Sequence, residues 1–346
     1  MTQSMRVFVT GGTEFVGRHV VERLRASGHD ITCLARRPDH PAATRLQGAR
    51  TRLVRGDVLD PSAVIRGMAD SDAVIHAAGL YSLWEPDTRA YWRVNVEGTR
   101  NVMEAALQTG VGKVVHIGSI VTYGRQAVVP FTEAATPGRL ASEYARSKAA
   151  GEELAWNRHR TRGLPLVVVS PASVLGAGDP KASGQYITNL VQRRLPARAA
   201  ERGRFTFVHV RDVADAIVRA TEQRGNIGQR YLVGREVLSF REMNDLVART
   251  AGAPVPALAL PDTVALVTAR LLTAVADRIK RSPLWGFSVD QVRTMLDGSE
   301  ADGSKAEREL GLQYTPIGLA IQEMVAEVQS GRSMSRAESA PAQVSR

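Results

Sequence analysis

Short apolar runs alternate with amphipathic stretches along most of this chain. Residues 6–10 form a β-branched run, and a glycine-containing segment, residues 11–17, follows it directly. Apolar residues then recur at helical spacing as far as Ser27-Gly28, a pair suited to end a helix, and residues 31–35 form a second apolar run. A strand, a tight turn, a helix and a second strand in this order predict a parallel βαβ unit.

The same alternation continues to about residue 281. We expect further strands where short apolar runs are bounded by turn residues, at residues 53–54, 72–79, 114–117, 166–170, 205–210 and 230–233. We expect helices where apolar residues recur at helical spacing, at residues 91–107, 143–160, 212–222, 240–250 and 262–281. Strands that alternate with helices predict an α/β fold with a doubly wound parallel sheet.

Composition limits the class of protein. The 346 residues, 44% of them hydrophobic, are enough for one large α/β domain or two moderate ones. The single cysteine, Cys33, lies in a predicted buried strand, so we expect no disulfides and a reducing, cytoplasmic location. No signal peptide is expected, because the first residues already read as a strand. The seven histidines form no helical pair and have no neighbouring cysteine, so we expect no metal site.

The net charge of +10 raises the question of nucleic-acid binding, but the distribution of charge argues against it. Five of the 45 basic residues are lysines and the rest are arginines, scattered beside acidic residues. They form no basic run with interleaved aromatic residues, and no helix-turn-helix or zinc pattern occurs. We expect a solvated, arginine-rich surface and no nucleic-acid partner.

The glycine segment and the ends of the next strands predict a dinucleotide site. Glycines let the backbone approach a pyrophosphate, and the following helix N-terminus offers free N–H groups. The pattern is imperfect because Glu14 holds the place of the middle glycine, where its carboxylate would repel phosphate. Asp57 and the small residues 77–79 end successive strands, where ligands of open α/β sheets lie. A plain tight turn, a turn aspartate and close helix packing are the alternatives.

Three side chains fit acid–base chemistry at an alcohol or ketone. Tyr144 and Lys148 share a face of the predicted helix 143–160, and Ser119 follows the predicted strand 114–117. Hydride transfer at a carbinol carbon requires a proton to move at its oxygen. A neighbouring ammonium, together with the positive charge of an oxidised nicotinamide, lowers the pKa of a phenol. We therefore assign Tyr144 as general acid/base, Lys148 as its electrostatic partner and Ser119 as hydrogen-bond donor to the substrate oxygen.

Polar and aromatic residues near these strand ends each allow two interpretations. Tyr81 and Trp84, just past the strand 72–79, predict a wall of a substrate pocket, although exposed aromatic residues can be incidental. Asn95 lies inside a predicted helix and needs a partner there, so it either holds the active site or braces a neighbouring loop.

Together these motifs resemble the extended short-chain dehydrogenase/reductases. Within them, the chain is similar to the NAD(P)-dependent epimerase/dehydratase group, near its dihydroflavonol-reductase-like and hopanoid-associated sugar-epimerase members. The resemblance covers nearly the whole chain except its C-terminal tail, residues 331–346. The motifs that carry it are Thr10-Gly11-Gly12-Thr13-x-Phe15-x-Gly17, Asp57-Val58, His76-Ala77-Ala78-Gly79, Asn95-Val96-x-Gly98-Thr99-x-Asn101, Ser119-x-x-x-Tyr123-Gly124, Tyr144-x-x-x-Lys148, Ser170-Pro171-Ala172-Ser173-Val174-Leu175-Gly176-x-Gly178, Val208-His209-Val210-x-Asp212-Val213-Ala214, Gly228-x-x-Tyr231-x-x-Gly234 and Ser304-Lys305-Ala306-x-x-Glu309-Leu310-Gly311.

The resemblance implies a domain organisation, and the oligomeric state is left to test. It implies a Rossmann-type dinucleotide-binding domain over residues 1–170. Residues 171–330 would form a mainly substrate-binding lobe, smaller and interleaved with elements that return to the sheet. Ser, Ala, Arg and Pro dominate residues 331–346, which we expect to be a disordered tail. A homodimer is the oligomer to test.

The resemblance also implies a set of site residues. Lys148 would hold the nicotinamide ribose hydroxyls, and Pro171 would lie against the nicotinamide. The expected cofactor residues are Gly11, Thr13, Phe15, Val16, Arg36, Arg37, Asp57, Val58, Ala77, Ala78, Gly79, Asn95, Tyr144, Lys148 and Pro171. The expected substrate residues are Tyr81, Trp84, Ser119 and His209.

Cofactor preference is read at the end of the second strand. An acidic residue there would bind the ribose 2′-OH of NAD, but this chain has Ala35 followed by Arg36 and Arg37. Two cations without the acid favour the 2′-phosphate of NADP(H), with NAD(H) as the alternative.

The residues after Ser119 narrow the reaction. Sugar-nucleotide 4,6-dehydratases of the family carry Asp-Glu after the catalytic hydroxyl residue, whereas this chain has Ile120 and Val121, which cannot move protons. We therefore expect a net oxidation or reduction that interconverts a ketone and a secondary alcohol of a small-molecule substrate. A nucleotide-sugar epimerase that retains its cofactor is the alternative, and a catalytically silent NADP sensor is a third reading.

Residues 263–276 are almost wholly apolar but contain Arg270, and they are far too few to span a bilayer. We expect no integral membrane span and a helix of the substrate lobe. Peripheral membrane contact is the alternative, because Arg278, Lys280 and Arg281 follow this segment.

Overall fold

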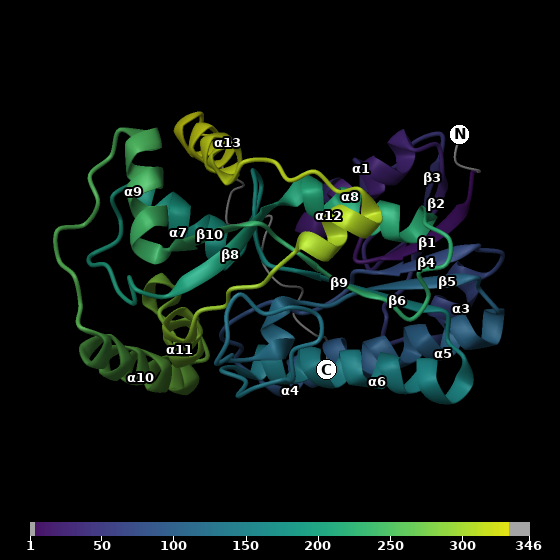
Figure 1. Ribbon diagram of the computed structural model, residues 1–346, viewed down its shortest axis with the longest axis horizontal. Helices are drawn as coiled ribbons and strands as arrows, with labels where there is room; N and C mark the ends of the chain where they lie inside the picture. Colours follow the sequence, from purple (N-terminus) through teal and green to yellow (C-terminus); the bar gives the residue numbers. More distant parts are fainter. Residues whose placement is uncertain (1–3, 332–346) are drawn as a thin grey trace.

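The computed structural model describes residues 4–331, so the expected tail lies outside the described residues apart from Gly331. Seven parallel strands form a sheet in the order β3-β2-β1-β4-β5-β6-β9 (Figure 1), which confirms the predicted doubly wound α/β fold. The strands are β1 (Arg6–Thr10), β2 (Asp30–Ala35), β3 (Thr51–Arg55), β4 (Ala73–His76), β5 (Lys113–Ile117), β6 (Leu166–Pro171) and β9 (Arg230–Val233).

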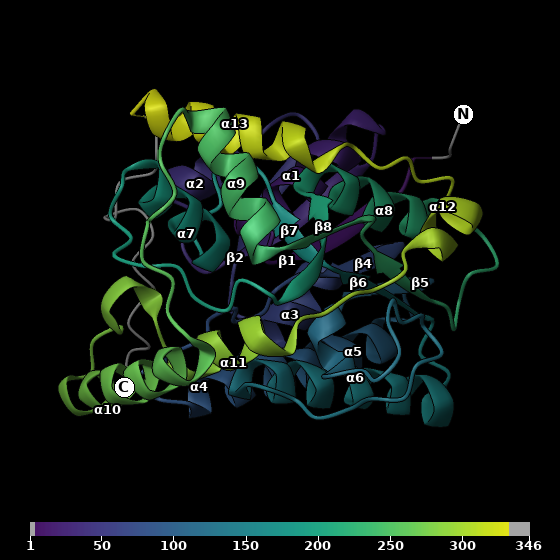
Figure 2. The same cartoon turned by 60° about the vertical axis from the view of Figure 1, so that its left-hand side comes forward.

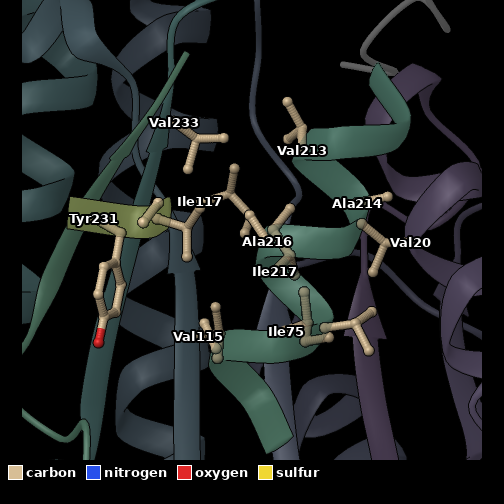
Figure 3. Packing of buried hydrophobic residues seen from close by; sticks show 14 of the residues in the cluster. Val20, Ile75, Val115, Ile117, Val213, Ala214, Ala216, Ile217, Tyr231 and Val233 are labelled. Atoms are coloured by element: carbon tan, nitrogen blue, oxygen red, sulfur yellow. The ribbon is translucent and has the colours of Figure 1, made fainter. Parts of the chain in front are cut away.

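Helices cover both faces of this sheet. One layer contains α1 (Phe15–Ala26), α8 (Val210–Glu222) and α12 (Ser304–Leu310), and the other contains α3 (Pro61–Met68), α5 (Thr99–Thr109) and α6 (Glu143–Arg162). Alternate residues of a buried strand enter opposite layers, as the two-residue period requires. On β5, Val115 joins the cluster under α8 that Figure 3 shows, and Val114 joins the cluster under α5.

A smaller lobe stands beyond the carboxyl ends of these strands. Its sheet has the order β10-β8-β7, with β7 (Ser173–Leu175), β8 (Arg204–His209) and β10 (Glu236–Ser239). A separate core lies between this sheet and α7 (Ala182–Val191), α9 (Phe240–Ala251) and α13 (Ile317–Gln329). The helices α10 (Asp262–Ile279) and α11 (Val289–Asp297) pack together at its outer edge (Figures 1 and 2).

The chain passes between the two parts more than once. β9, α8 and α12 all follow residue 170 in sequence yet pack on the large sheet. The predicted boundary at residue 170 falls at the end of β6, and the division into domains stays a prediction. Among the described residues, no helix is both long enough and apolar enough to cross a bilayer.

The helix predicted over residues 91–107 is not regular. It consists of α4 (Arg89–Trp92), a π-helical segment η1 (Arg93–Gly98) and α5. Helix α6 packs so closely against η1 that a Cβ on Gly151 would lie 2.1 Å from the carbonyl oxygen of Asn95. The wide turn therefore stands where two helices touch, beside the predicted catalytic helix, and π-helical turns are frequent at functional sites.

Candidate active site

The glycine segment forms a tight turn against the end of β4. Gly11 has φ +72°, and a Cβ there would lie 2.5 Å from the backbone nitrogen of Ala78. A Cβ on Gly17 would lie 2.0 Å from the carbonyl oxygen of Gly11. The turn delivers the chain into α1 at Phe15, so the free N–H groups of that helix N-terminus lie beside the small residues that end β4.

Glu14 turns toward the end of β2. Its side chain is partly exposed, and its Oε1 lies 3.7 Å from Nη2 of Arg36. The expected repulsion of phosphate by this carboxylate is therefore offset by a neighbouring guanidinium. The same contact draws Arg36 toward the glycine turn, while Arg37 is exposed beside it.

Ser119, Tyr144 and Lys148 line one cavity, which we name the central cavity. Ser119 follows β5 and begins a short 3-10 helix, η2 (Ile120–Tyr123). Helix α6 begins at Glu143, where Ser142 caps it by accepting the N–H of Ala145 at 3.1 Å. Tyr144 is therefore the second residue of a capped helix.

The pKa values in this cluster show which groups carry protons. Burial raises the pKa of Tyr144 to about 12, and a hydrogen bond with Ser119 offsets part of that effect. Burial lowers the pKa of Lys148 to about 8, opposed by the charge of Glu152. Burial is the dominant effect on the Tyr144 phenol, and Lys148 Nζ donates to the carbonyl oxygen of Ile117 at 2.7 Å. The lowering of the Tyr144 pKa by Lys148 together with an oxidised nicotinamide stays a prediction. At neutral pH Tyr144 holds its proton, so it can act as an acid.

A buried ion pair lies behind Lys148. Glu152 is one helical turn further along α6, and its Oε1 lies 2.6 Å from Nη2 of Arg230 on β9. Burial raises the pKa of Glu152, while Arg230 and Lys148 oppose that rise. The guanidinium also lies over the rings of Tyr123 and Trp156, at 5.5 and 5.1 Å from their centroids. Sequence reasoning did not find this pair, because the two residues are far apart in the chain.

Asn95 lies outside the lining of the central cavity, behind the loop that follows β4. Its Oδ1 accepts the N–H of Leu80 at 2.8 Å, and its Nδ2 donates to the carbonyl oxygen of Leu80 and to Ser147 Oγ at 3.2 and 2.9 Å. Of the two expected roles, these contacts favour bracing: Asn95 ties the loop to α6, one residue before Lys148.

The central cavity collects only part of the predicted site. Phe15, Val16, Ala77, Gly79, Tyr81, Ser119, Tyr144, Lys148 and Pro171 line it. Gly11, Thr13 and Ala78 belong to the same turn and strand end without lining it, and Arg36, Arg37, Asp57 and Val58 follow β2 and β3 outside the lining. Asp57 accepts the N–H of Leu59 at 2.9 Å, a turn bond, so its role toward a cofactor stays a prediction.

Two predicted substrate residues lie away from the central cavity. The indole N–H of Trp84 donates to Asp277 Oδ1 of α10 at 2.9 Å, which fastens the loop to that helix. His209 is buried at the start of α8, where its Nδ1 accepts the N–H of Arg211 at 3.1 Å. Neither residue lines the cavity, and their substrate roles stay predictions. Tyr81 does line it, with its ring centroid 5.1 Å from that of Tyr144.

The far side of the central cavity is mainly apolar and comes from the small lobe. Its large apolar residues are Tyr186, Phe205, Phe207, Phe240, Met243 and Met295. The sequence offers no common motif for them, because they come from four separate elements. Arg125 and Arg139 also line the cavity, and both pair with Asp297 Oδ1, at 3.7 and 3.0 Å. Among residues 4–331, no group of three or more His, Cys, Asp or Glu side chains is placed to hold a metal ion.

Residues 7–234 match the model of the NAD dependent epimerase/dehydratase family. The chain belongs to this family. A putative dihydroflavonol 4-reductase from Synechocystis sp. is 30% identical over 327 residues, 92% of this chain and 93% of the relative. Sterol demethylase protein B from Methylococcus capsulatus is 30% identical over 93% of this chain and 98% of its own length.

Other relatives of this epimerase/dehydratase family member are named for a different activity. Four are named UDP-glucose 4-epimerase and are 27% or 28% identical. The crystal structure of gox2253 superposes with a TM-score of 0.80 at 29% identity, over 95% of this chain and 100% of that chain. The resemblance predicted from the motifs is confirmed, and the relatives named for an activity include both reductases and epimerases.

Proposed function

We propose that this protein is an NAD(P)-dependent oxidoreductase that transfers hydride at the ketone or secondary alcohol carbon of an apolar small molecule. The observation that carries the proposal is the placing of Ser119, Tyr144 and Lys148 in one cavity with Val16 and Pro171. The cavity thus joins the start of α1 to the apolar surface of the small lobe. A dinucleotide laid across the strand ends would reach the acid–base residues.

The three polar side chains have distinct tasks in this proposal. A bound nicotinamide supplies or accepts the hydride. Ser119 donates a hydrogen bond to the substrate oxygen and orients it beside Tyr144. Tyr144, with its pKa raised to about 12, gives the oxygen its proton as the carbonyl is reduced. Lys148 carries its charge below pH about 8 and stabilises the phenolate that remains.

We also propose a preference for NADP(H). The support is Arg36 and Arg37, both exposed directly after β2, where the ribose 2′-phosphate would lie. Michaelis constants for NADPH and NADH test it: Arg36→Ser should raise the constant for NADPH and leave that for NADH nearly unchanged. Arg55→Ser, at the end of β3 and paired with Asp39, is the matched control. A wild-type preference for NADH overturns this part.

A nucleotide-sugar epimerase is the second candidate, and the names of the family and of four relatives favour it. A nucleotide diphosphate needs cations in the cavity. Arg125 and Arg139 already face Asp297, which leaves Lys181 and Lys148 as the other cations of the lining. The apolar surface from Phe205, Phe207 and Phe240 suits a hydrophobic ketone better.

One experiment separates these candidates. The purified protein is incubated with NADPH and a panel of apolar ketones while nicotinamide absorbance is followed, and separately with UDP-glucose while UDP-galactose is assayed. Oxidation of NADPH that depends on a ketone supports the proposal. Interconversion of the two sugars without net NADPH oxidation, together with no ketone turnover, refutes it in favour of the epimerase.

We place this activity in the cytoplasm, a reducing compartment that supplies NADPH. The support is chemical: Cys33 is a free, buried thiol, and burial raises its pKa to about 11, which keeps it unreactive. Cell fractionation with an antibody to the native protein tests this location.

A further inference from the structure

Helix α10 exposes most of its large apolar side chains on the outside of the molecule. Its most buried residues are small, Ala265, Ala269 and Ala276, while Leu266 and Leu272 are half-buried. Its outward face holds Val264, Val267, Leu271, Val275 and Ile279, which are 45% to 65% exposed. We name these five residues the α10 stripe. Five of the seven Val, Leu and Ile residues of this helix are therefore exposed, whereas an amphipathic surface helix usually turns such residues toward the core.

The α10 stripe is continuous and flanked by further apolar residues. Its members are three or four positions apart, so they share one helix face about 23 Å long. Leu284 and Trp285 follow, 61% and 52% exposed. Trp285 has φ +55°, a conformation that is costly for a bulky residue, and it keeps its indole at the surface. Figures 1 and 2 show α10 at the outer edge of the small lobe, away from the large sheet.

Positive charge predominates around the α10 stripe. Arg270, Arg278, Lys280 and Arg281 are all exposed on or directly after α10. By helical geometry Arg270 flanks the stripe and Arg278 lies within its last turn, whereas Asp277 is on the side that receives the indole N–H of Trp84. Apolar side chains at the centre, arginines around them and a tryptophan at one end match the interface of an anionic bilayer.

We propose that the α10 stripe docks this protein on the surface of an anionic lipid bilayer. The helix lies in the plane of the interface, with the stripe in the acyl boundary and the cations at the headgroups. The net charge of +10 favours the same partner.

The docking surface is one helix away from the central cavity. Helix α11 packs on α10, and its Met295 lines the cavity. Ser288 Oγ, at the start of α11, donates to the carbonyl oxygen of Leu83 at 2.7 Å, and Leu83 lines the cavity too. A substrate that partitions into the bilayer would meet the cavity close to the membrane surface. This last step rests on the proposed function, whereas docking itself does not.

Vesicle cosedimentation of the full-length protein tests the docking without any turnover. Vesicles of phosphatidylcholine are compared with vesicles that also contain phosphatidylglycerol. We expect the wild type to sediment with the anionic vesicles and Leu271→Glu/Val275→Glu to stay in solution. The matched control, Ile227→Glu/Leu319→Glu, changes two apolar residues that are 47% and 48% exposed elsewhere, and it should bind as the wild type does.

A second variant tests the role of charge. Arg270→Gln/Arg278→Gln/Arg281→Gln keeps the stripe, and we expect its affinity for anionic vesicles to fall about 100-fold, since each surface cation near an anionic leaflet contributes about a factor of five. Unchanged melting temperatures show that the variants are folded.

Three results would overturn the proposal. The wild type could fail to sediment with anionic vesicles, or the stripe variant could bind as well as its control. The wild type could also be a dimer in sedimentation equilibrium that the stripe variant turns into a monomer, without vesicle binding, in which case a second copy covers this face. Since NADPH titration is independent of the vesicles, failure of docking is distinguishable from failure of the proposed activity.

Discussion

Replacing Glu152 by glutamine should strongly destabilise the protein, although Glu152 does not line the central cavity. The change keeps the shape of the side chain and removes the only charge paired with Arg230 among the described residues. Glu152 is 4% exposed and Arg230 27%, so water compensates little for the lost partner. Breaking a buried ion pair on one side costs about 3 to 5 kcal/mol. We expect a loss of that size in the free energy of unfolding.

Urea unfolding of the protein, followed by circular dichroism, measures this loss. The control is Glu153→Gln at the next position, where the carboxylate is 67% exposed and pairs with the exposed Arg160. An exposed pair contributes about 0 to 1 kcal/mol, so the control should unfold nearly as the wild type does. Equal stability of the two variants would refute the reasoning.

The same substitution has a second readout at Lys148. Glu152 holds the pKa of this lysine up against burial, so its loss lowers that pKa further below about 8. The pH above which ketone reduction declines should therefore move downward in Glu152→Gln and stay in place in Glu153→Gln. A merely structural role for Glu152 would leave this pH unchanged.

Three further predictions concern the turn, the core and the loop brace. Gly17→Ala should abolish NADPH binding in fluorescence titration, because a Cβ would lie 2.0 Å from the Gly11 carbonyl oxygen, whereas Gly318→Ala meets nothing within 4 Å and should bind normally. Burial lowers the pKa of His76 to about 3, below its ordinary 6.5, so the unfolded chain takes up the proton first. The contribution of His76 to the free energy of unfolding should be complete above pH about 6.5 and fall by about 1.4 kcal/mol per pH unit below it, and the buried His116 acts in the same direction. Equal urea midpoints at pH about 7 and 5 would contradict this. Asn95→Ala should lower the free energy of unfolding by about 1 to 3 kcal/mol, because it leaves buried polar groups unpaired. It should also raise the Michaelis constant for the ketone, because it frees the loop after β4. Unchanged urea unfolding and unchanged kinetics would contradict the bracing role of Asn95.

Local patterns predicted the parts of the site that are local. Tyr144 and Lys148 are one helical turn apart, so their spacing alone placed them on one face, and both line the cavity. The glycine turn was recognised in the same way, because Gly11 needs a positive φ and a close approach. The strands of the large sheet were found where apolar runs are short and bounded by turn residues.

Parts that depend on tertiary contacts were missed. The apolar wall from Phe205, Phe240 and Met295 comes from separate elements that meet only in the fold. The strands β7 and β10, which flank β8 in the small sheet, were not predicted from the sequence either. The contact of Trp84 is of the same kind: its indole N–H donates to Asp277, on a helix about 190 residues away in the sequence, and its role in a pocket wall stays a prediction.

The acid–base role of Tyr144 is tested most directly by Tyr144→Phe. The measurement is kcat/KM for NADPH-dependent ketone reduction, with the dissociation constant of NADPH determined in parallel and Tyr123→Phe, a buried tyrosine outside the cavity lining, as control. We predict that kcat/KM falls about 100-fold to 10,000-fold in Tyr144→Phe while NADPH binds as tightly as before, because only proton transfer is lost. Turnover equal to that of the wild type would contradict the account.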